Sequence, residues 1–402
     1  MTELTIAVTR TEKSKVLVAF TITMLAVSTV FMTQSIFLEI SESFKIDITQ
    51  ARFSFGVVSL FYSASFFFIG PVADKYDLPK IAVTGLALLA MAVLFASLTP
   101  NFRLFIIAMA LIGICAASIP AAMFPLIAMI SAEKKAGFYV GLIVAAATLG
   151  VTFGRVLMGL LTSNIGWQFS FRIVSAVLFF LSAVSFFILI EKRNEKLRNH
   201  KKLFKLYVNL IRLMSNPKTL SLLLVGFGLY FGFLGMITFL TYRLVAPPFN
   251  FSSGEVGWIS LAGISALIAP FSGNISQKIG SFKVIFPSLL VCLLSFQLMG
   301  WFQSITLTTL GVLLLFFGVY ACQPVIFLLI GQRVPRESIG SASSLYILFC
   351  LGGGSLSSII LGPVWRSYGW QGITAFCSIS LLISLLIMSF NALKNTEIES
   401  EH

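Results

Sequence analysis

A few charged side chains lie within or beside long apolar segments, and they are the first candidates for chemistry. Arg155 lies inside the apolar run 138–161, where its permanently charged guanidinium can hold a carboxylate or phosphate through two parallel hydrogen bonds. The same side chain can instead extend to the membrane surface, and the sequence leaves both roles open. Among the 15 acids, Glu39 lies deepest, near the end of the run 16–38. A carboxylate there is a candidate for proton coupling.

The composition places the chain in a lipid bilayer. Hydrophobic residues make up 57% of its 402 residues and charged residues only 11%, whereas soluble domains carry about 25% charged residues. A membrane-spanning helix needs about 20 apolar residues. Such runs occur at 16–38, 53–73, 81–98, 102–130, 138–161, 171–190, 219–240, 256–276, 284–302, 306–331, 339–361 and 373–393. We therefore predict an all-α membrane protein with twelve transmembrane helices, because only a helix satisfies its own backbone groups within lipid.

The positions of the lysines and arginines predict the orientation. Most of the 28 lie in segments that are cytoplasmic if the N-terminus is inside, which is the usual bias of inner loops. Six lie at the opposite ends of the spans: Lys45, Arg52, Arg103, Arg172, Arg243 and Arg366. We expect a multi-pass protein of the inner or plasma membrane with both termini in the cytoplasm. The net charge of +13 then reflects topology and attraction to the inner leaflet rather than nucleic-acid binding.

The longest polar segment, 191–218, divides the chain into an N-terminal part, 1–190, and a C-terminal part, 219–402. Within this basic, cytoplasmic linker, leucines recur at spacings of three and four, which predicts an amphipathic helix on the inner leaflet. These leucines are Leu203, Leu206, Leu210 and Leu213. The segment can be a tether between the two halves or a lipid sensor.

The two halves repeat each other in one register. A shift of 203 residues aligns Gly70, Lys75 and Lys80 with Gly273, Lys278 and Lys283. The same shift aligns Gly137, Gly150, Gly159 and GWQ at 166–168 with Gly340, Gly353, Gly362 and GWQ at 369–371. Because a single register serves two distant blocks, the pattern indicates duplication of a six-helix unit and thus two pseudo-symmetric six-helix bundles.

The polar loop GPVADKYDLPK, residues 70–80, resembles the signature loop of the major facilitator superfamily. In that loop a glycine is followed four residues later by Asp and then by basic residues; Gly70, Asp74, Lys75 and Lys80 match. With the spans, the repeat and the basic central loop, the resemblance covers nearly the whole chain and implies a secondary transporter. Gly70 lets two helices approach closely, and Asp74 can accept from the positive N-terminal end of a helix in the other half. The loop can therefore latch a gate, or its charges can merely fix the topology.

A second block resembles the drug and metabolite efflux branch of this superfamily, whose fifth span carries a glycine-rich antiporter motif of the form GxxxGPxxGG. Gly150, Gly154 and Gly159 match it, while Arg155 replaces its proline. Met109 stands where the branch usually has an arginine linked to proton coupling. The resemblance implies proton-coupled efflux of drugs or metabolites. Uptake of a small anionic or zwitterionic metabolite is the alternative.

The superfamily lines its central path with the first, fourth, seventh and tenth helices. By this resemblance, the candidates for the substrate pathway are Gln34, Tyr230, Tyr320 and Gln323, with Tyr62 on the second helix nearby. Arg155 joins them as the candidate anion-binding group. Buried amides and phenols must find hydrogen-bond partners. Each of these side chains can therefore contact a substrate or another helix.

Other classes of protein lack their motifs in this sequence. A primary pump needs a phosphate-binding GxxxxGK[ST] loop, and the sequence has none; HExxH and GxSxG are absent as well. We therefore predict no enzyme activity, no cofactor and no metal site. The expected partners are a small-molecule substrate, protons and the lipid bilayer, with no nucleic acid, and we expect a monomer. A membrane receptor or scaffold that transports nothing stays open.

Overall fold

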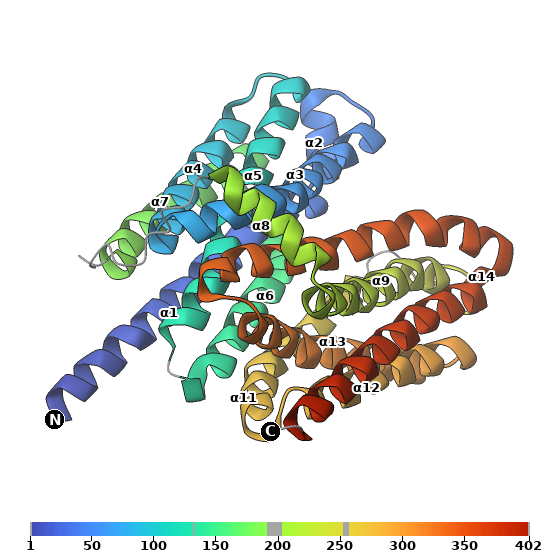
Figure 1. Cartoon of the computed structure of the whole chain (residues 1–402). Coiled ribbons are helices and arrows are strands. Elements are labelled where there is room, and N and C mark those ends of the chain that lie inside the picture. Colours follow the sequence, from blue (N-terminus) through green and yellow to red (C-terminus); the bar gives the residue numbers. More distant parts are fainter. Residues whose placement is uncertain (1, 132, 191–202, 252–256, 401–402) are drawn as a thin grey trace. The chain divides into compact units, whose positions relative to one another are not determined.

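The structure, a computed structural model, describes residues 2–131, 133–190, 203–251 and 257–400, and these residues form helices joined by short turns, with no strand among them (Figure 1). The first half contains α1 (Thr2–Phe31), η1 (Met32–Ser35), α2 (Phe37–Phe44), α3 (Ile48–Lys75), α4 (Leu78–Leu98), α5 (Phe102–Ile130), α6 (Glu133–Ile165) and α7 (Trp167–Leu189). The second half contains α8 (Leu203–Ser215), α9 (Pro217–Val245), η2 (Gly257–Ile268), α11 (Ala269–Ile279), α12 (Phe282–Trp301), α13 (Ile305–Arg333), η3 (Arg336–Ser338) and α14 (Ile339–Ser400). The all-α fold predicted from the sequence is confirmed.

Backbone contacts group the chain into two compact units. Unit 1 comprises Met1–Ala132, Ala146–Val208 and Glu337–Ser344, and unit 2 comprises Glu133–Ala145, Asn209–Arg336 and Leu345–His402. In unit 1, α5 packs against α1, α3 and α4, and α4 also packs against α7. In unit 2, α13 packs against α9, η2, α11 and α12. Two short segments, 133–145 and 337–344, thus belong to the unit built mainly from the other half of the sequence. The division at 191–218 stays a prediction.

Ten helices of the described chain are long and apolar enough to cross a membrane, and they correspond to eleven of the twelve predicted runs. The helix α14 holds two runs, because Gly369 (φ 58°, ψ −149°) interrupts its helical geometry. The run 256–276 is described from Gly257 onward as η2 followed by α11, so no single α-helix of spanning length covers it.

The two GWQ sequences mark the same backbone feature. Gly166 between α6 and α7 has a φ of 78°, and Gly369 has a φ of 58°. Residues with a Cβ rarely adopt a positive φ, so both positions favour glycine. The repeat register of 203 residues therefore aligns two helix breaks as well as two sequences.

The first apolar run departs from its prediction. The run 16–38 is not one continuous helix, because α1 ends at Phe31 and the 3₁₀ turn η1 precedes α2. The Ser35 hydroxyl donates to the Met32 carbonyl at 3.2 Å, and the Ile36 amide donates to the Thr33 carbonyl at 3.2 Å. Hydrogen bonds between residues three apart are those of a 3₁₀ turn.

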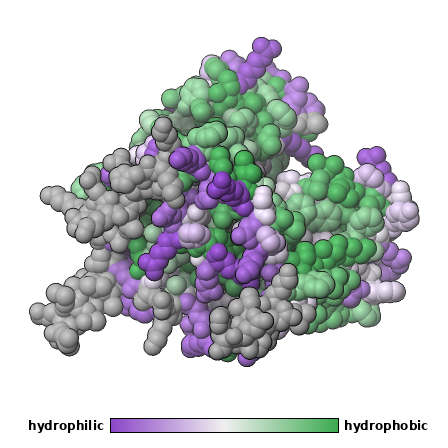
Figure 2. All heavy atoms as spheres, viewed as in Figure 1, coloured by the Kyte–Doolittle hydropathy of each residue, from purple (hydrophilic) through white to green (hydrophobic). Residues whose placement is uncertain are grey.

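The helix α8 occupies the segment where the leucine spacing predicts an amphipathic helix. Leu206, Leu210 and Leu213 are buried, whereas Phe204 is exposed. Figure 2 shows hydrophilic side chains gathered on the part of the visible face where α8 lies, and apolar side chains over much of the remaining visible surface. Such an exposed apolar surface is expected of helices that face lipid.

Glycines bring α6 against α1 within unit 1. A Cβ added at Gly154 would lie 2.8 Å from the Ser28 Cα, and one added at Gly150 would lie 3.1 Å from the Val27 Cβ. The Ser28 hydroxyl donates to the Gly150 carbonyl at 3.0 Å. By contrast, a Cβ at Gly159 would lie 3.9 Å from its nearest neighbour, the Ser35 Cβ. Two of the three antiporter-like glycines therefore serve close helix packing.

This difference predicts opposite effects of one substitution. Gly154→Ala should lower the melting temperature in detergent, because overpacking typically costs about 1–3 kcal/mol. Gly159→Ala is the matched control and should leave the melting temperature unchanged or raise it, since alanine is favoured over glycine in helices by about 1 kcal/mol. Equal melting temperatures for the two variants would contradict the close α1–α6 contact.

Candidate functional site

The carboxylate of Asp74 binds the N-terminal turn of a helix far away in the sequence. Asp74 lies at the end of α3, and its two oxygens accept from the backbone amide of Ser341 at 3.2 Å each. The Ser341 hydroxyl also donates to this carboxylate. Ser341 is the third residue of α14, so a negative charge caps a helix end that carries a partial positive charge. Both partners belong to unit 1.

Small residues make this contact possible. A Cβ added at Gly70 would lie 3.0 Å from the Ser344 Cβ and 3.1 Å from the Ser341 Cα. A Cβ added at Gly340 would lie 2.8 Å from an oxygen of Asp74. Glycine at both positions lets α3 meet the start of α14 at backbone distance.

The repeat places a second, uncharged contact in unit 2. Gln277 on α11 follows Gly273 by four residues, just as Asp74 follows Gly70. Its side-chain oxygen accepts from the backbone amide of Gly137 at 2.8 Å, near the start of α6. An added Cβ at Gly137 or Gly273 would collide with the backbone carbonyl of the other. Sequence analysis overlooked Gln277, although the shift of 203 residues aligns it with Asp74.

The basic residues of the signature loop and of its repeat lie outside these two contacts. The ammonium of Lys75 lies 5.4 Å from the ring centroid of Tyr76. Lys80, Lys278 and Lys283 are exposed.

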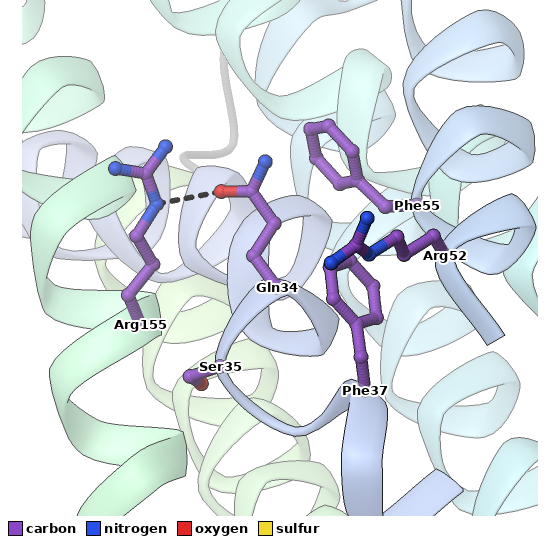
Figure 3. Close-up of a pocket in the computed structure, with 6 residues that line it drawn as sticks. All are labelled: Gln34, Ser35, Phe37, Arg52, Phe55 and Arg155. Carbon is purple, nitrogen blue, oxygen red and sulfur yellow. Dashed lines mark hydrogen bonds between the residues drawn. The ribbon is translucent and has the colours of Figure 1, made fainter. Parts of the chain in front are cut away.

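Arg155 and Gln34 meet beside a pocket in unit 1 (Figure 3). The Arg155 Nε donates to the Gln34 Oε1 at 2.6 Å, and the guanidinium carbon lies 5.5 Å from the ring centroid of Phe31. The pocket has a volume of about 470 Å³ and is lined by Gln34, Ser35, Phe37, Arg52, Phe55 and Arg155. Sequence analysis found two of these six residues. Arg52 was assigned only to the topology signal.

Glu39 lies in the first turn of α2 and is half-buried. It follows Phe37, the first residue of α2 and part of the pocket lining, by two positions. Glu39 itself does not line the pocket. On the same helix Glu42 is exposed.

Two of the three candidate pathway residues of unit 2, Tyr230 and Tyr320, lie around one phenylalanine. The ring centroid of Phe233 lies 5.9 Å from that of Tyr230, 5.0 Å from that of Phe316 and 6.2 Å from that of Tyr320. The side-chain oxygen of Gln323 is buried and accepts no hydrogen bond from the described residues. In unit 1, Tyr62 packs edge-on against Phe66 at 5.1 Å. Both residues lie on α3, and Tyr62 is buried and does not line the arginine pocket.

Arg243 has a role that its sequence position did not indicate. The charge distribution assigns it only to the outer end of a span, and in the structure the side chain is buried in unit 2. Its guanidinium donates to the carbonyls of Met299 and Phe302 at the end of α12 and lies 4.7 Å from the Trp370 ring centroid. A cation at a helix C-terminus stabilises that end, so Arg243 is a capping residue.

The described residues place no group of three or more His, Cys, Asp or Glu side chains where it could hold a metal ion. The arrangement can bind an anion at Arg52 and Arg155 and can cap a helix with Asp74.

Comparison with known proteins agrees with this picture. The Bacillus subtilis (strain 168) protein described as an uncharacterized MFS-type transporter, YybF, is 23% identical over 365 residues, which cover 90% of this chain and 89% of that protein. The inner membrane transport protein YnfM of Escherichia coli (strain K12) is 26% identical over 359 residues, which cover 89% of this chain and 85% of that protein.

A solved structure shares the fold. The human organic anion transporter MFSD10 (TETRAN) superposes with a TM-score of 0.79 at 17% identity, covering 94% of this chain and 99% of that one. Residues 17–358 match the sequence profile of the Major Facilitator Superfamily. The chain therefore belongs to the Major Facilitator Superfamily.

Proposed function

We propose that this membrane transporter is a secondary active transporter that exports small organic molecules, such as drugs or metabolites, by alternating access coupled to protons. It lies in the inner or plasma membrane with both termini in the cytoplasm. Two six-helix bundles, 1–190 and 219–402, rock against each other in this mechanism. Membership of the family supports transport; export, proton coupling and orientation are the proposed refinements.

The observation that supports the mechanism best is the capping of α14 by Asp74. A charge at a helix terminus contributes about 0.3–1 kcal/mol, and up to about 2 kcal/mol when partly buried. Conformations in an alternating cycle differ by only a few kcal/mol. One such contact is therefore large enough to bias the cycle toward the state in which it forms, which makes it a latch.

Uptake of a small anionic or zwitterionic metabolite is the second candidate, and the arginine pocket favours it. Arg52 and Arg155 line one pocket, and the human protein of the same fold is named an organic anion transporter. The pocket supports an anionic substrate, and experiment decides the direction of transport.

Flux measurements in proteoliposomes test transport, direction and coupling together. Radiolabelled small molecules are screened with pH gradients of either sign and with protein oriented in either direction. Export by antiport is supported if the substrate moves from the cytoplasmic side of the protein to the outer side and if a proton gradient of the opposite direction drives this movement. Absence of flux for every compound, with correctly inserted protein, would favour a receptor or scaffold.

Asp74→Asn should lower the transport rate strongly while leaving membrane insertion intact. Asparagine keeps one oxygen acceptor but loses the charge, and a loss of about 1–2 kcal/mol shifts a conformational balance by roughly 5–30-fold. Asp77→Asn is the matched control: Asp77 lies in the same loop, is exposed, and makes no side-chain cap to α4. Equal rates for Asp74→Asn and wild type at equal protein levels would reduce the loop to a topology signal.

Glu39→Gln tests proton coupling. If Glu39 carries the proton, this variant should lose accumulation driven by a pH gradient but retain exchange of substrate across the membrane. Glu42→Gln removes a charge from the exposed face of the same helix and should behave as wild type. If the pH gradient has no effect on transport by the wild-type protein, proton antiport is excluded. If the pH gradient still drives accumulation in the Glu39→Gln variant, Glu39 is excluded as the residue that carries the proton.

A further inference from the structure

The pocket of unit 1 collects positive charge on several separate elements. Its volume of about 470 Å³ is that of a site for a small organic ligand, since such sites range over about 300–1,000 Å³. Arg52 comes from α3 and Arg155 from α6, and in the view of Figure 3 they lie on opposite sides of Gln34. The six lining residues of the described chain include no carboxylate.

The backbone beside the pocket adds to this positive potential. Irregular backbone at membrane depth is tolerated where it lines a water-filled cavity, and Gln34 and Ser35 lie in the 3₁₀ interruption between α1 and α2. Ile36 occupies the N-cap position of α2, so no side-chain hydrogen bond caps that helix. Phe37, its first residue, lines the pocket. The partial positive charge of the α2 N-terminus therefore lies at the pocket wall, partly offset by the Glu39 carboxylate in the same turn.

Aromatic rings form the rest of the wall. Phe37 and Phe55 line the pocket. The ring centroid of Phe55 lies 5.6 Å from that of Phe31, which in turn lies 5.5 Å from the Arg155 guanidinium carbon. A ligand that meets both kinds of surface needs an anionic group and an apolar, preferably planar, body.

We propose that this pocket binds an organic anion whose oxyanion group is held by Arg52 and Arg155 and whose aromatic body packs against Phe37 and Phe55. Gln34 is a positioning residue, because its oxygen holds the Arg155 guanidinium. That this ligand is the carried substrate rests on the proposed function; the binding itself does not.

Direct binding to purified full-length protein in phosphatidylcholine nanodiscs tests the site without transport. The probes are 2-naphthoate and 2-naphthalenesulfonate, with the neutral isostere 2-naphthamide for comparison, and heat release on titration is the readout. Both anions should bind at least about tenfold more tightly than the amide, because hydrogen bonds to a charged group are about twice as strong as neutral ones. Equal affinities for anion and amide, or no binding of either anion, would overturn the proposal.

Variants assign the roles. Arg155→Lys should weaken naphthoate binding by about tenfold, since an ammonium lacks the planar two-point grip, and Arg52→Gln should weaken it similarly. Arg103→Gln is the control: Arg103 is exposed at the start of α5 and does not line the pocket. Wild-type affinity in Arg155→Lys would mean that the side chain only extends to the surface.

Gln34→Glu is the sharpest variant. It keeps the oxygen that accepts from Arg155 and nearly the same shape, but it adds a negative charge to the pocket. Anion affinity should fall by at least about tenfold through charge repulsion, and by more than the affinity for the neutral naphthamide falls. Undiminished anion affinity in this folded variant would contradict the site.

A lipid phosphate offers the same chemistry as a soluble organic anion, so a second set of nanodiscs contains phosphatidylglycerol. Naphthoate affinity that is unchanged there assigns the pocket to soluble anions, whereas competition assigns it to a lipid head group. The proposals also fail separately: binding as described without any flux would remove transport and leave the pocket. Flux of other compounds with no anion binding would remove the pocket alone.

Discussion

The structure depends on one constraint: within lipid, each backbone amide and carbonyl must find its partner inside the protein. Long helices meet it at the level of the single segment. They gain little from burying apolar side chains against each other, because lipid is equally apolar, and so they associate through close packing of small residues. The α1–α6 contact at Gly150 and Gly154 and the glycine pairs beside Asp74 and Gln277 follow from this rule. Positions where a helix is interrupted are exceptions to this rule and therefore call for a separate explanation.

The sequence predicts the parts of the fold that depend on composition and spacing. Apolar runs of about 20 residues predict the spans, and the 203-residue register aligns the two GWQ sequences at which the structure shows breaks, Gly166 and Gly369. The break at η1 is not predicted from the sequence. The hydropathy of Thr33, Gln34 and Ser35 is similar to that of polar residues found within continuous helices. The turn is formed by local hydrogen bonds to the carbonyls of Met32 and Thr33, and a hydropathy profile does not report such bonds.

Side-chain roles were predictable where the residue type leaves few choices. An arginine inside an apolar run must find a polar environment, so Arg155 stood out, and the structure gives it Gln34. Arg243 and Arg52 lie at span ends, where topology alone accounts for a positive charge. One of them caps a helix and the other lines a pocket. Only distances in the three-dimensional structure distinguish an arginine that caps a helix or lines a pocket from one that serves the topology alone.

The two contacts at the repeated positions differ in chemistry although their geometry is alike. Asp74 offers a full negative charge to the start of α14, whereas Gln277 offers a neutral oxygen to the start of α6. A charge-assisted hydrogen bond is roughly twice as strong as a neutral one, so the duplicated unit carries one strong and one weak helix cap.

The irregular features of unit 1 also compensate one another. A guanidinium costs about 2.5–3.5 kcal/mol at the centre of a spanning helix, and a broken helix exposes backbone groups that lipid cannot satisfy. Gathered around one cavity, both can meet water or a polar ligand, and the Gln34 side chain links the broken segment to Arg155. Arg52 and Asp74 lie near opposite ends of α3, about 33 Å apart at 1.5 Å per residue. The same helix α3 therefore carries Arg52 of the pocket near one end and Asp74 near the other.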